Sequence, residues 1–268
     1  VEDFTVGRLT DEDAIYQWGK KFDLITIEIE NVSVAALKRL EKEGVKVFPQ
    51  PHIIELIQDK RTQKVFYKEN EIPTADFELV EDLQDIQSKK HWLPAVNKVG
   101  KEGYDGKGVQ ILRTEDDLRK GFDSPGLLEN LVDFEKELSV IVARNEKGEM
   151  KCFPLVELSY HPEQNLVEFL FAPAQVSKSI EAAAYELAKD VISKLSMVGL
   201  LAVEMFLTKD GHLLVNEVAP RTHNSGHHTI EANVTSQFEQ HIRAILNIPL
   251  GSTLLRTPAA KGNLLGED

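Results

Sequence analysis

The sequence has a single cysteine, no long apolar run and no excess of basic residues, and each absence excludes a class of protein. Cys152 alone cannot form a disulfide framework or a cysteine-rich zinc site, and it suits a reducing compartment. The longest apolar runs, such as Val198–Val203, are too short to cross a bilayer, and the first residues lack the pattern of a secretory signal. We therefore expect a cytoplasmic protein without a membrane segment.

Acidic residues outnumber basic ones by 44 to 31, which gives a net charge of −13. This balance argues against a nucleic-acid-binding surface. It does not exclude small anionic ligands, because these need only a local cluster of cations or a glycine-rich loop. The 268 residues, 42% of them hydrophobic, are enough for more than one domain.

Both ends of the sequence look internal to a longer protein. Val1 is not a methionine, and Glu267 and Asp268 follow an apolar pair without a terminating element. We expect the natural protein to continue on both sides.

The first part of the chain has the pattern of an α/β unit. Leu24–Ile29 and Val45–Phe48 are rich in β-forming residues, and the helical pattern Val34–Glu43 lies between them behind two candidate caps, Asn31 and Ser33. The order strand, helix, strand predicts a fragment of a parallel sheet.

After Pro49 and Pro51, which we expect to break the chain, a helical region continues to Pro73, and β-forming segments then dominate. Strands grouped with strands after an α/β opening predict α+β lobes attached to a nucleotide-binding α/β domain. The expected helices are Ile53–Ile57, Thr62–Lys68 and Ser179–Leu195, and the expected strands are Phe77–Val80, Ala95–Val99, Val109–Leu112, Glu137–Arg144, Lys151–Val156 and two around Asp210–Gly211.

A glycine-rich segment, Gly100–Gly108, lies between two expected strands. Its glycines allow the backbone to approach a ligand and to aim N–H groups at phosphate oxygens, and Lys98 and Lys107 add positive charge. The segment matches neither the Walker nor the dinucleotide-binding pattern, because no helix with the required spacing follows. A hairpin turn without a ligand is the alternative interpretation.

Two glutamates stand on neighbouring strands of an expected hairpin. Asp210–Gly211 is a strong signal for a two-residue turn, and a turn there pairs Lys209 with His212 and places Glu204 opposite Glu217. Carboxylates that face each other repel unless a cation neutralises them. Since Mg²⁺ binds through carboxylates together with substrate phosphates, the pair predicts a metal site. A solvated pair on an exposed face is the alternative.

A run of polar side chains follows the second glutamate directly. Arg221 offers a planar fork that suits a small oxyanion such as bicarbonate or phosphate. His223, Asn224 and Ser225 offer neutral hydrogen bonds to the same anion, and Asn224 or Ser225 also suits the cap of a following helix. The cluster therefore predicts an anion site beside the metal.

Together these segments resemble the ATP-grasp superfamily, and within it the 5-(carboxyamino)imidazole ribonucleotide synthetases of purine biosynthesis. The His-Asn-Ser-Gly-His run after Pro-Arg is highly specific, and the likeness covers nearly the whole chain. The residues that carry it are Tyr104–Gly108, Asn216–Arg221 and His223–His227, with support from Asp59–Lys64, Thr235–Glu239 and Asn263–Gly266.

The resemblance implies a fold of mixed α/β and α+β class, in three parts. Residues 1–52 would form a partial N-terminal Rossmann-like (pre-ATP-grasp) domain. Residues 53–250 would form the ATP-grasp domain, with a small lid lobe at about 75–125 and a larger lobe at about 126–250. Residues 251–268 would begin a C-terminal lobe, which in the family adds a lysine and an arginine for the nucleotide substrate.

The resemblance also implies roles for individual residues. In the family, ATP binds with Mg²⁺, and bicarbonate and aminoimidazole ribonucleotide are the other substrates. The implied ATP site comprises Lys60, Lys98, Gly103, Gly106, Lys107, Gly108, Glu129, Asn130, Leu131, Glu137 and Asn216, with Glu129, Asn130 and Leu131 at the adenine hinge and Glu137 at the ribose. Mg²⁺ would be held by Glu204 and Glu217, bicarbonate by Arg221, His223, Asn224 and Ser225, and the ribonucleotide by Tyr104, Asp105 and Lys107.

The implied reaction suits these residues, because phosphoryl transfer needs positioning and charge neutralisation more than a protein nucleophile. Two alternatives remain open: another ATP-grasp ligase that joins a carboxylate to an amine, and a truncated, non-catalytic ATP-binding module. The family is commonly dimeric, so a homodimer is expected, and Gln237–Leu246 is either an interface helix or a packed one.

Overall fold

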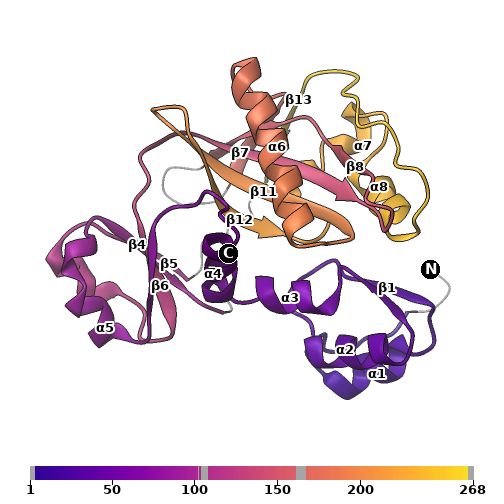
Figure 1. Ribbon diagram of the computed structural model, residues 1–268, viewed down its shortest axis with the longest axis horizontal. Helices are drawn as coiled ribbons and strands as arrows, with labels where there is room; N and C mark the ends of the chain where they lie inside the picture. The colour runs from indigo at the N-terminus through magenta and orange to yellow at the C-terminus, as the bar shows by residue number, and fades with distance from the viewer. Residues whose placement is uncertain (1–3, 102, 104–107, 161–166, 265–268) are drawn as a thin grey trace.

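The structure, a computed structural model, describes residues 4–101, 103, 108–160 and 167–264. Three bodies of secondary structure are visible in Figure 1: an α/β unit at the N-terminus, a four-stranded sheet and a seven-stranded sheet. Helices α3 (Pro51–Ile57) and α4 (Lys60–Glu69) lie between the two smaller bodies. Of the helices in these ranges, none is long and apolar enough to span a membrane.

The N-terminal unit confirms the predicted strand, helix, strand order. Strands β1 (Leu24–Thr26) and β2 (Lys46–Phe48) pair in parallel, and helix α2 (Val34–Lys42) joins them, with α1 (Glu12–Gly19) packed beside it. The Ser33 side chain caps α2 by accepting from the amide of Ala36. The prediction that Pro51 breaks the chain was wrong: Pro51 begins α3, where its missing N–H costs nothing.

The four-stranded sheet forms a small lobe in which every neighbouring pair is antiparallel. Its order is β3 (Phe77–Val80), β6 (Gly126–Asn130), β4 (Ala95–Val99) and β5 (Val109–Leu112), and α5 (Leu83–Ser88) and the 3₁₀ turns Lys90–Trp92 and Glu115–Lys120 complete the lobe. The three predicted strands in this lobe have the predicted bounds; β6 was not expected.

The seven-stranded sheet forms the large lobe and carries helices on both faces. Its order is β12 (Leu213–Ala219), β11 (Gly199–Thr208), β7 (Phe134–Arg144), β9 (Val156–Tyr160), β10 (Val167–Ala172) and β13 (Ala259–Gly262), and β8 (Met150–Cys152) also pairs with β7. Helix α6 (Lys178–Lys194) covers one face, and α8 (Gln237–Ile245) packs on the other. The predicted strand Lys151–Val156 is two separate strands, β8 and the start of β9.

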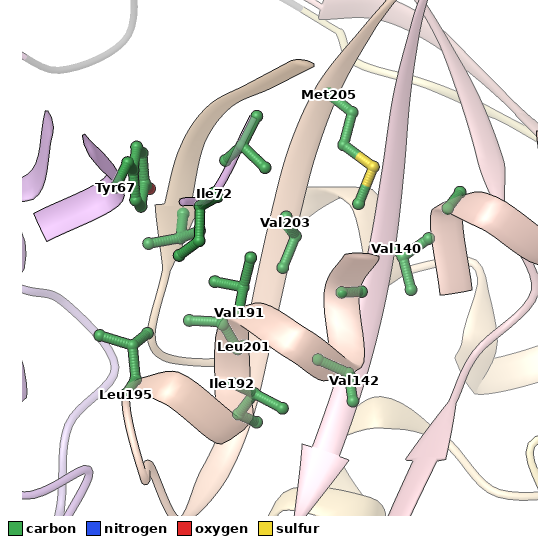
Figure 2. Close-up of a cluster of buried hydrophobic side chains, with 14 of the residues drawn as sticks. Tyr67, Ile72, Val140, Val142, Val191, Ile192, Leu195, Leu201, Val203 and Met205 are labelled. Carbon is green, nitrogen blue, oxygen red and sulfur yellow. The ribbon is translucent and has the colours of Figure 1, made fainter. Parts of the chain in front are cut away.

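The side chains of β11 point alternately to the two faces of the large sheet. Leu201, Val203 and Met205 point toward α6 in a core that also contains Tyr67 and Ile72 from α4 and the following segment (Figure 2). The intervening side chains therefore point to the opposite face. Glu204 is one of these, so the candidate site lies on the face that α6 leaves uncovered.

A β-bulge at Asn216 decides where Glu217 points. Glu204 pairs with Glu217 but Met205 pairs with Val215, so Asn216 is an extra residue in β12. Val215 and Val218 both lie in the α6 core, which is possible only because the bulge shifts the alternation by one residue. Without the bulge, Glu217 would point into this apolar core.

The hairpin therefore has the predicted pairing of the two glutamates, but its turn differs from the predicted one. The amide of Thr208 donates to the carbonyl of His212 at 2.9 Å, so the loop has three residues rather than two. The predicted pairing of Lys209 with His212 was wrong. The longer loop and the bulge each shift the register by one residue, and the two shifts cancel at Glu204 and Glu217.

Candidate active site

Two carboxylates face each other across β11 and β12, and their environments differ. Burial raises the pKa of Glu204, and the charge of Glu217 raises it further. The pKa of Glu217 is lowered instead, mainly because the ammonium group of Lys60 lies 2.5 Å from its Oε2 atom. Glu204 therefore has no close counter-charge of its own, and an added cation would favour its ionised form.

Lys60 is the first residue of α4 and reaches this pair from the helix N-terminus. Asp59 caps the helix, and the backbone amide of Lys60 donates to the carbonyl of Gly100 at 2.7 Å. Burial lowers the pKa of Lys60, but the attraction of Glu217 more than offsets this and holds it above its usual value. Lys60 is thus charged and is tied to the start of the glycine-rich segment.

The neck of the glycine-rich segment is closed by β4 and β5. The amide of Val99 donates to the carbonyl of Gly108 at 2.9 Å, and Gly108 has a φ of +79°. A Cβ atom at Gly108 would lie 2.4 Å from the Val99 side chain and 3.1 Å from Cα of Gly103, so only glycine fits. The candidate ligands Tyr104, Asp105, Gly106 and Lys107 lie outside the described residues.

A second charged cluster lies at the junction of the two lobes. The ammonium group of Lys98 is 2.7 Å from Glu129 Oε2 and 2.9 Å from Asn216 Oδ1, so the bulged residue of β12 contacts β4 of the small lobe. Lys64 pairs with the other oxygen of Glu129 at 2.8 Å. Sequence reasoning missed Lys64 as a site residue, although it lies one helical turn after Lys60.

Backbone hydrogen bonds at the end of β6 exclude two of the amides that were predicted to contact adenine. The amide of Asn130 donates to the carbonyl of Asp76, and that of Leu131 donates to the carbonyl of Pro94. Neither amide is therefore available to a base. In the described part of the chain, the first amide after β6 without a partner is that of Val132.

The predicted anion-site residues gather after β12, at the edge of the acidic pair. His223 Nε2 lies 3.6 Å from Glu204 Oε1, and His223 Nδ1 lies 2.9 Å from the Ser225 hydroxyl. Burial lowers the pKa of His223 to about 4, and the nearby Arg221 contributes to this shift. The ring is therefore neutral near pH 7 and can both donate and accept a hydrogen bond.

Three residues to which the sequence analysis assigned no role in the site hold this cluster in place. The hydroxyl of Ser139 on β7 lies 2.9 Å from that of Ser225. Gln237, the first residue of α8, bonds the backbone of His223 through both ends of its side-chain amide, at 2.8 and 2.9 Å. The ammonium group of Lys261 on β13 contacts the Asn224 side chain and lies 3.0 Å from its carbonyl oxygen.

Arg221 connects the cluster to the N-terminal unit. Its Nε atom lies 2.7 Å from Glu30 Oε2, and the two side chains are equally half-buried. Glu30 follows β1, so this ion pair joins two domains that are far apart in sequence. Glu137, predicted to bind ribose, lies on β7 opposite Phe206 of β11, on the face of the sheet that carries Glu204.

The donor set fits Mg²⁺ bound together with phosphates. Within the described ranges, no group of three or more His, Cys, Asp and Glu side chains gathers to hold a metal alone. Glu204 and Glu217 supply two carboxylates, and Mg²⁺ typically takes one or two carboxylates with phosphate oxygens and water.

Two family models and several known proteins match this chain. A model described as an ATP-grasp domain matches residues 65–238, and one described as a ribonucleotide synthetase preATP-grasp domain matches residues 1–58. The crystal structure of N5-carboxyaminoimidazole ribonucleotide synthetase from Thermotoga maritima is 46% identical, with a TM-score of 0.88 over 98% of this chain and 69% of that one. The chain belongs to the N5-carboxyaminoimidazole ribonucleotide synthase family of ATP-grasp proteins.

Other members of the N5-carboxyaminoimidazole ribonucleotide synthase family show the same likeness. The Bacillus subtilis (strain 168) synthase is 40% identical, over 96% of this chain and 69% of its own length. A structure from Aspergillus clavatus in complex with ADP and 5-aminoimidazole ribonucleotide is 32% identical, with a TM-score of 0.90 over 97% of this chain and 70% of that one. The chain spans about half, 48%, of a matching carboxylase from Vigna aconitifolia. ATP binding and the ATP-grasp fold are thus properties of the family.

Proposed function

We propose that this chain carries the ATP-dependent carboxylation of 5-aminoimidazole ribonucleotide with bicarbonate, which yields 5-(carboxyamino)imidazole ribonucleotide, ADP and phosphate. The observation that carries the proposal is the placement of Glu204 and Glu217 side by side with Lys60, at the edge of the cluster around Arg221 and His223. A carboxylate pair for a metal thus lies next to donors for an anion. The names of the relatives supply the identity of the acceptor.

The nucleotide would lie between the two lobes. We assign Lys60 and Lys98 to its phosphates and Glu137 to its ribose. Glu204 and Glu217 would hold Mg²⁺, which would neutralise phosphate charge. Lys60, which pairs with Glu217, would contact a phosphate beside this carboxylate.

The anion donors would place bicarbonate in line with the γ-phosphate. Arg221 supplies charge through a planar fork, while His223, neutral near pH 7, Asn224 and Ser225 supply hydrogen bonds. A bicarbonate oxygen attacks the γ-phosphorus, the bond to ADP breaks, and carboxyphosphate forms. The amine of the ribonucleotide then attacks the carboxyl carbon, phosphate leaves, and the amine loses a proton. Within the described residues we assign no group as the base for that proton.

The direct test measures phosphate release and incorporation of labelled bicarbonate, with each substrate omitted in turn. We expect both signals to require Mg-ATP, bicarbonate and the ribonucleotide together. The change Arg221→Gln should lower kcat/KM for bicarbonate by about a hundredfold or more, because a charge-assisted contact to the anion is lost, while ATP affinity changes little. The matched control is Arg243→Gln on the outer surface of α8.

Phosphate release that does not depend on the ribonucleotide would favour another carboxylate-amine ligase. ATP binding without any turnover, also in the full-length protein, would favour a non-catalytic ATP-binding module. Either result would reject the proposed reaction.

The chain is also proposed to form a homodimer through α8 and the segments beside it. Phe238 and Ile242 on α8 and Leu246 directly after it recur at intervals of four residues, and all three are substantially exposed. Ile230 and Ile248, which flank the helix in sequence, are exposed as well. An apolar stripe of this kind is typical of a surface that a second protein surface covers.

Molar mass in solution tests the dimer. The change Ile242→Glu should shift the protein from dimer to monomer, because it places a charge in the stripe. Ile111→Glu on the small lobe is the control, since Ile111 has a similar exposed fraction, 42% against 47%. A wild-type monomer at micromolar concentration would contradict the dimer. Location in the cytoplasm stays a prediction, supported by the single cysteine.

A further inference from the structure

Lys64 is a buried lysine next to the residues proposed to contact ATP. Lys64 is only 2% exposed and lies on α4, one turn after Lys60. Its ammonium group has three partners: Glu129 Oε1 at 2.8 Å, the Thr74 hydroxyl at 2.5 Å and the Ala75 carbonyl at 3.2 Å. These contacts use its three N–H donors, so Lys64 has none left for a ligand.

Lys64 shares its carboxylate with Lys98. Glu129 is 4% exposed, and its second oxygen lies 2.7 Å from the Lys98 ammonium group. Burial alone would raise the pKa of Glu129, but the two lysines more than offset this and hold it below its usual value. The cluster therefore contains one negative and two positive charges. The left-over positive charge is shared with Glu204 and Glu217 outside the cluster, because Lys98 also lowers the pKa of these two carboxyl groups.

The left-over charge lies on the Lys98 side of the cluster. Lys98 is oriented by only one further side chain, the Asn216 amide oxygen, which is neutral. Lys64 is enclosed by α4, residues 74–75 and β6, and a phosphate cannot reach it without breaking its contacts. An anion drawn to the cluster therefore meets Lys98.

Lys64 also fixes the connection between the lobes. The Thr74 hydroxyl, which accepts from Lys64, donates to the carbonyl of Val215 at 2.6 Å, and the Val215 amide donates to the carbonyl of Pro73 at 2.7 Å. Val215 directly precedes the bulged Asn216. Lys64 is thus linked to the position of Asn216 through the backbone and to Lys98 through Glu129.

We propose that Lys64 is a positioning residue for nucleotide binding. It pairs with one oxygen of Glu129, so that Glu129 neutralises Lys98 only in part and Lys98 can attract a phosphate of ATP. The proposal rests on the proposed function, because it assumes that Lys98 contacts phosphate. Without Lys64, Glu129 would pair with Lys98 alone, and the cluster would have no net charge to offer.

The test compares the affinities for ADP and for adenosine, measured by calorimetry on the whole chain. In Lys64→Met we expect ADP to bind at least about tenfold more weakly while adenosine affinity changes less than about threefold, since only ADP carries phosphates. In the double variant Lys64→Met/Glu129→Gln, Lys98 is freed from the carboxylate, and ADP affinity should return to within about threefold of wild type. Lys68→Met, an exposed lysine on the same helix, is the matched control.

A purely structural role for Lys64 gives a different pattern. It would weaken ADP and adenosine equally, or leave the double variant as weak as the single one, and either result overturns the inference. If Lys64→Met fails to fold, the double variant alone tests the inference, because the glutamine that replaces Glu129 carries no charge that needs a second lysine. A loss of ADP affinity of more than about tenfold in the double variant would then reject the inference. A wild-type chain that binds ADP no better than adenosine would instead reject the proposed ATP site.

Discussion

Two charge clusters lie next to each other where the lobes meet, one half-buried around Glu204 and Glu217 and one buried around Glu129, and their imbalances have opposite signs. The pair Glu204 and Glu217 has one close cation, Lys60. The carboxylate of Glu129 has two, Lys64 and Lys98. Taken alone, the first cluster is short of positive charge and the second is short of negative charge, and Lys98 couples them because it lowers the pKa of both Glu204 and Glu217.

Under the proposed function, this difference matches each cluster to a partner. A buried charge without a counter-charge costs several kcal/mol, so an imbalance persists where a ligand supplies the missing charge. The acidic pair matches a divalent cation, and the cluster of two lysines matches a phosphate. Mg-ATP carries both, so in the proposed complex the metal would lie against β11 and β12 and the phosphates toward β4 and α4.

Loss of one carboxylate from the acidic pair should have the largest effect. We expect Glu217→Ala to lower ribonucleotide-dependent phosphate release at least about a thousandfold, because the metal loses a ligand and the phosphates lose charge neutralisation. Asp210→Asn at the tip of the same hairpin, where the side chain is 71% exposed, is the control. A Glu217→Ala variant that retains a tenth of the activity would show that the pair is not the metal site.

Loss of the shared carboxylate should instead destabilise the fold. Glu129→Gln leaves two buried lysines without a counter-charge, so we expect the free energy of unfolding in urea to fall by about 3 kcal/mol. The control is Glu78→Gln, which removes a half-exposed ion pair with Lys89 in the same lobe and should cost less than about 1 kcal/mol. Equal losses in the two variants would contradict the difference between the clusters.

The corresponding change in the acidic pair should have the opposite sign. The folded-state pKa of Glu204 is raised by burial and by Glu217, so its carboxylate costs stability at neutral pH. Without Mg²⁺, Glu204→Gln should raise the free energy of unfolding by about 2 kcal/mol at pH 7.

That gain should shrink as the pH falls toward the unfolded-state pKa of about 4.5, because the wild-type carboxyl group is then protonated in the unfolded state as well as in the folded state. Added Mg-ATP should reverse the ranking, since only the wild type keeps both carboxylates for the metal. A Glu204→Gln variant that is less stable than wild type at pH 7 without metal would refute the like-charge argument.

The smallest expected effect on stability concerns His241, a buried side chain without a counter-charge. His241 on α8 is 5% exposed, its Nε2 atom lies 2.7 Å from the Thr26 hydroxyl, and burial lowers its pKa to about 4. Its contribution to stability is complete above the unfolded-state pKa of about 6.5 and is lost as the pH falls toward 4.

Between pH 7 and pH 5.5 this group should therefore cost the wild type about 1 kcal/mol that His241→Gln does not lose. His212→Gln, at the exposed hairpin tip, should follow the wild-type slope. If His241→Gln keeps the full wild-type slope, the buried ring does not titrate between the two states as its environment implies.

Local patterns in the sequence were enough to predict the elements and much of the site. The bounds of β3, β4 and β5 and the cap of α2 follow from alternation and capping, which depend on residues only a few positions apart. The motif residues after β12 were likewise recognisable, and they lie together in space around His223. The facing of Glu204 and Glu217 was predicted correctly from a turn that the structure does not contain.

The charge relations between distant segments were decided by the tertiary structure alone. The bulge at Asn216 exists because Val215 and Val218 both have to enter the α6 core, and no local pattern in β12 shows that requirement. Lys64 meets Glu129 only because α4 packs against the end of β6, and Arg221 meets Glu30 only because the N-terminal unit lies against the large lobe. The sequence by itself determined which residues carry charge and which segments alternate, since these are properties of neighbouring residues. Which charges share a partner was determined by packing, because an ion pair depends on a distance of a few ångströms that sequence separation does not fix.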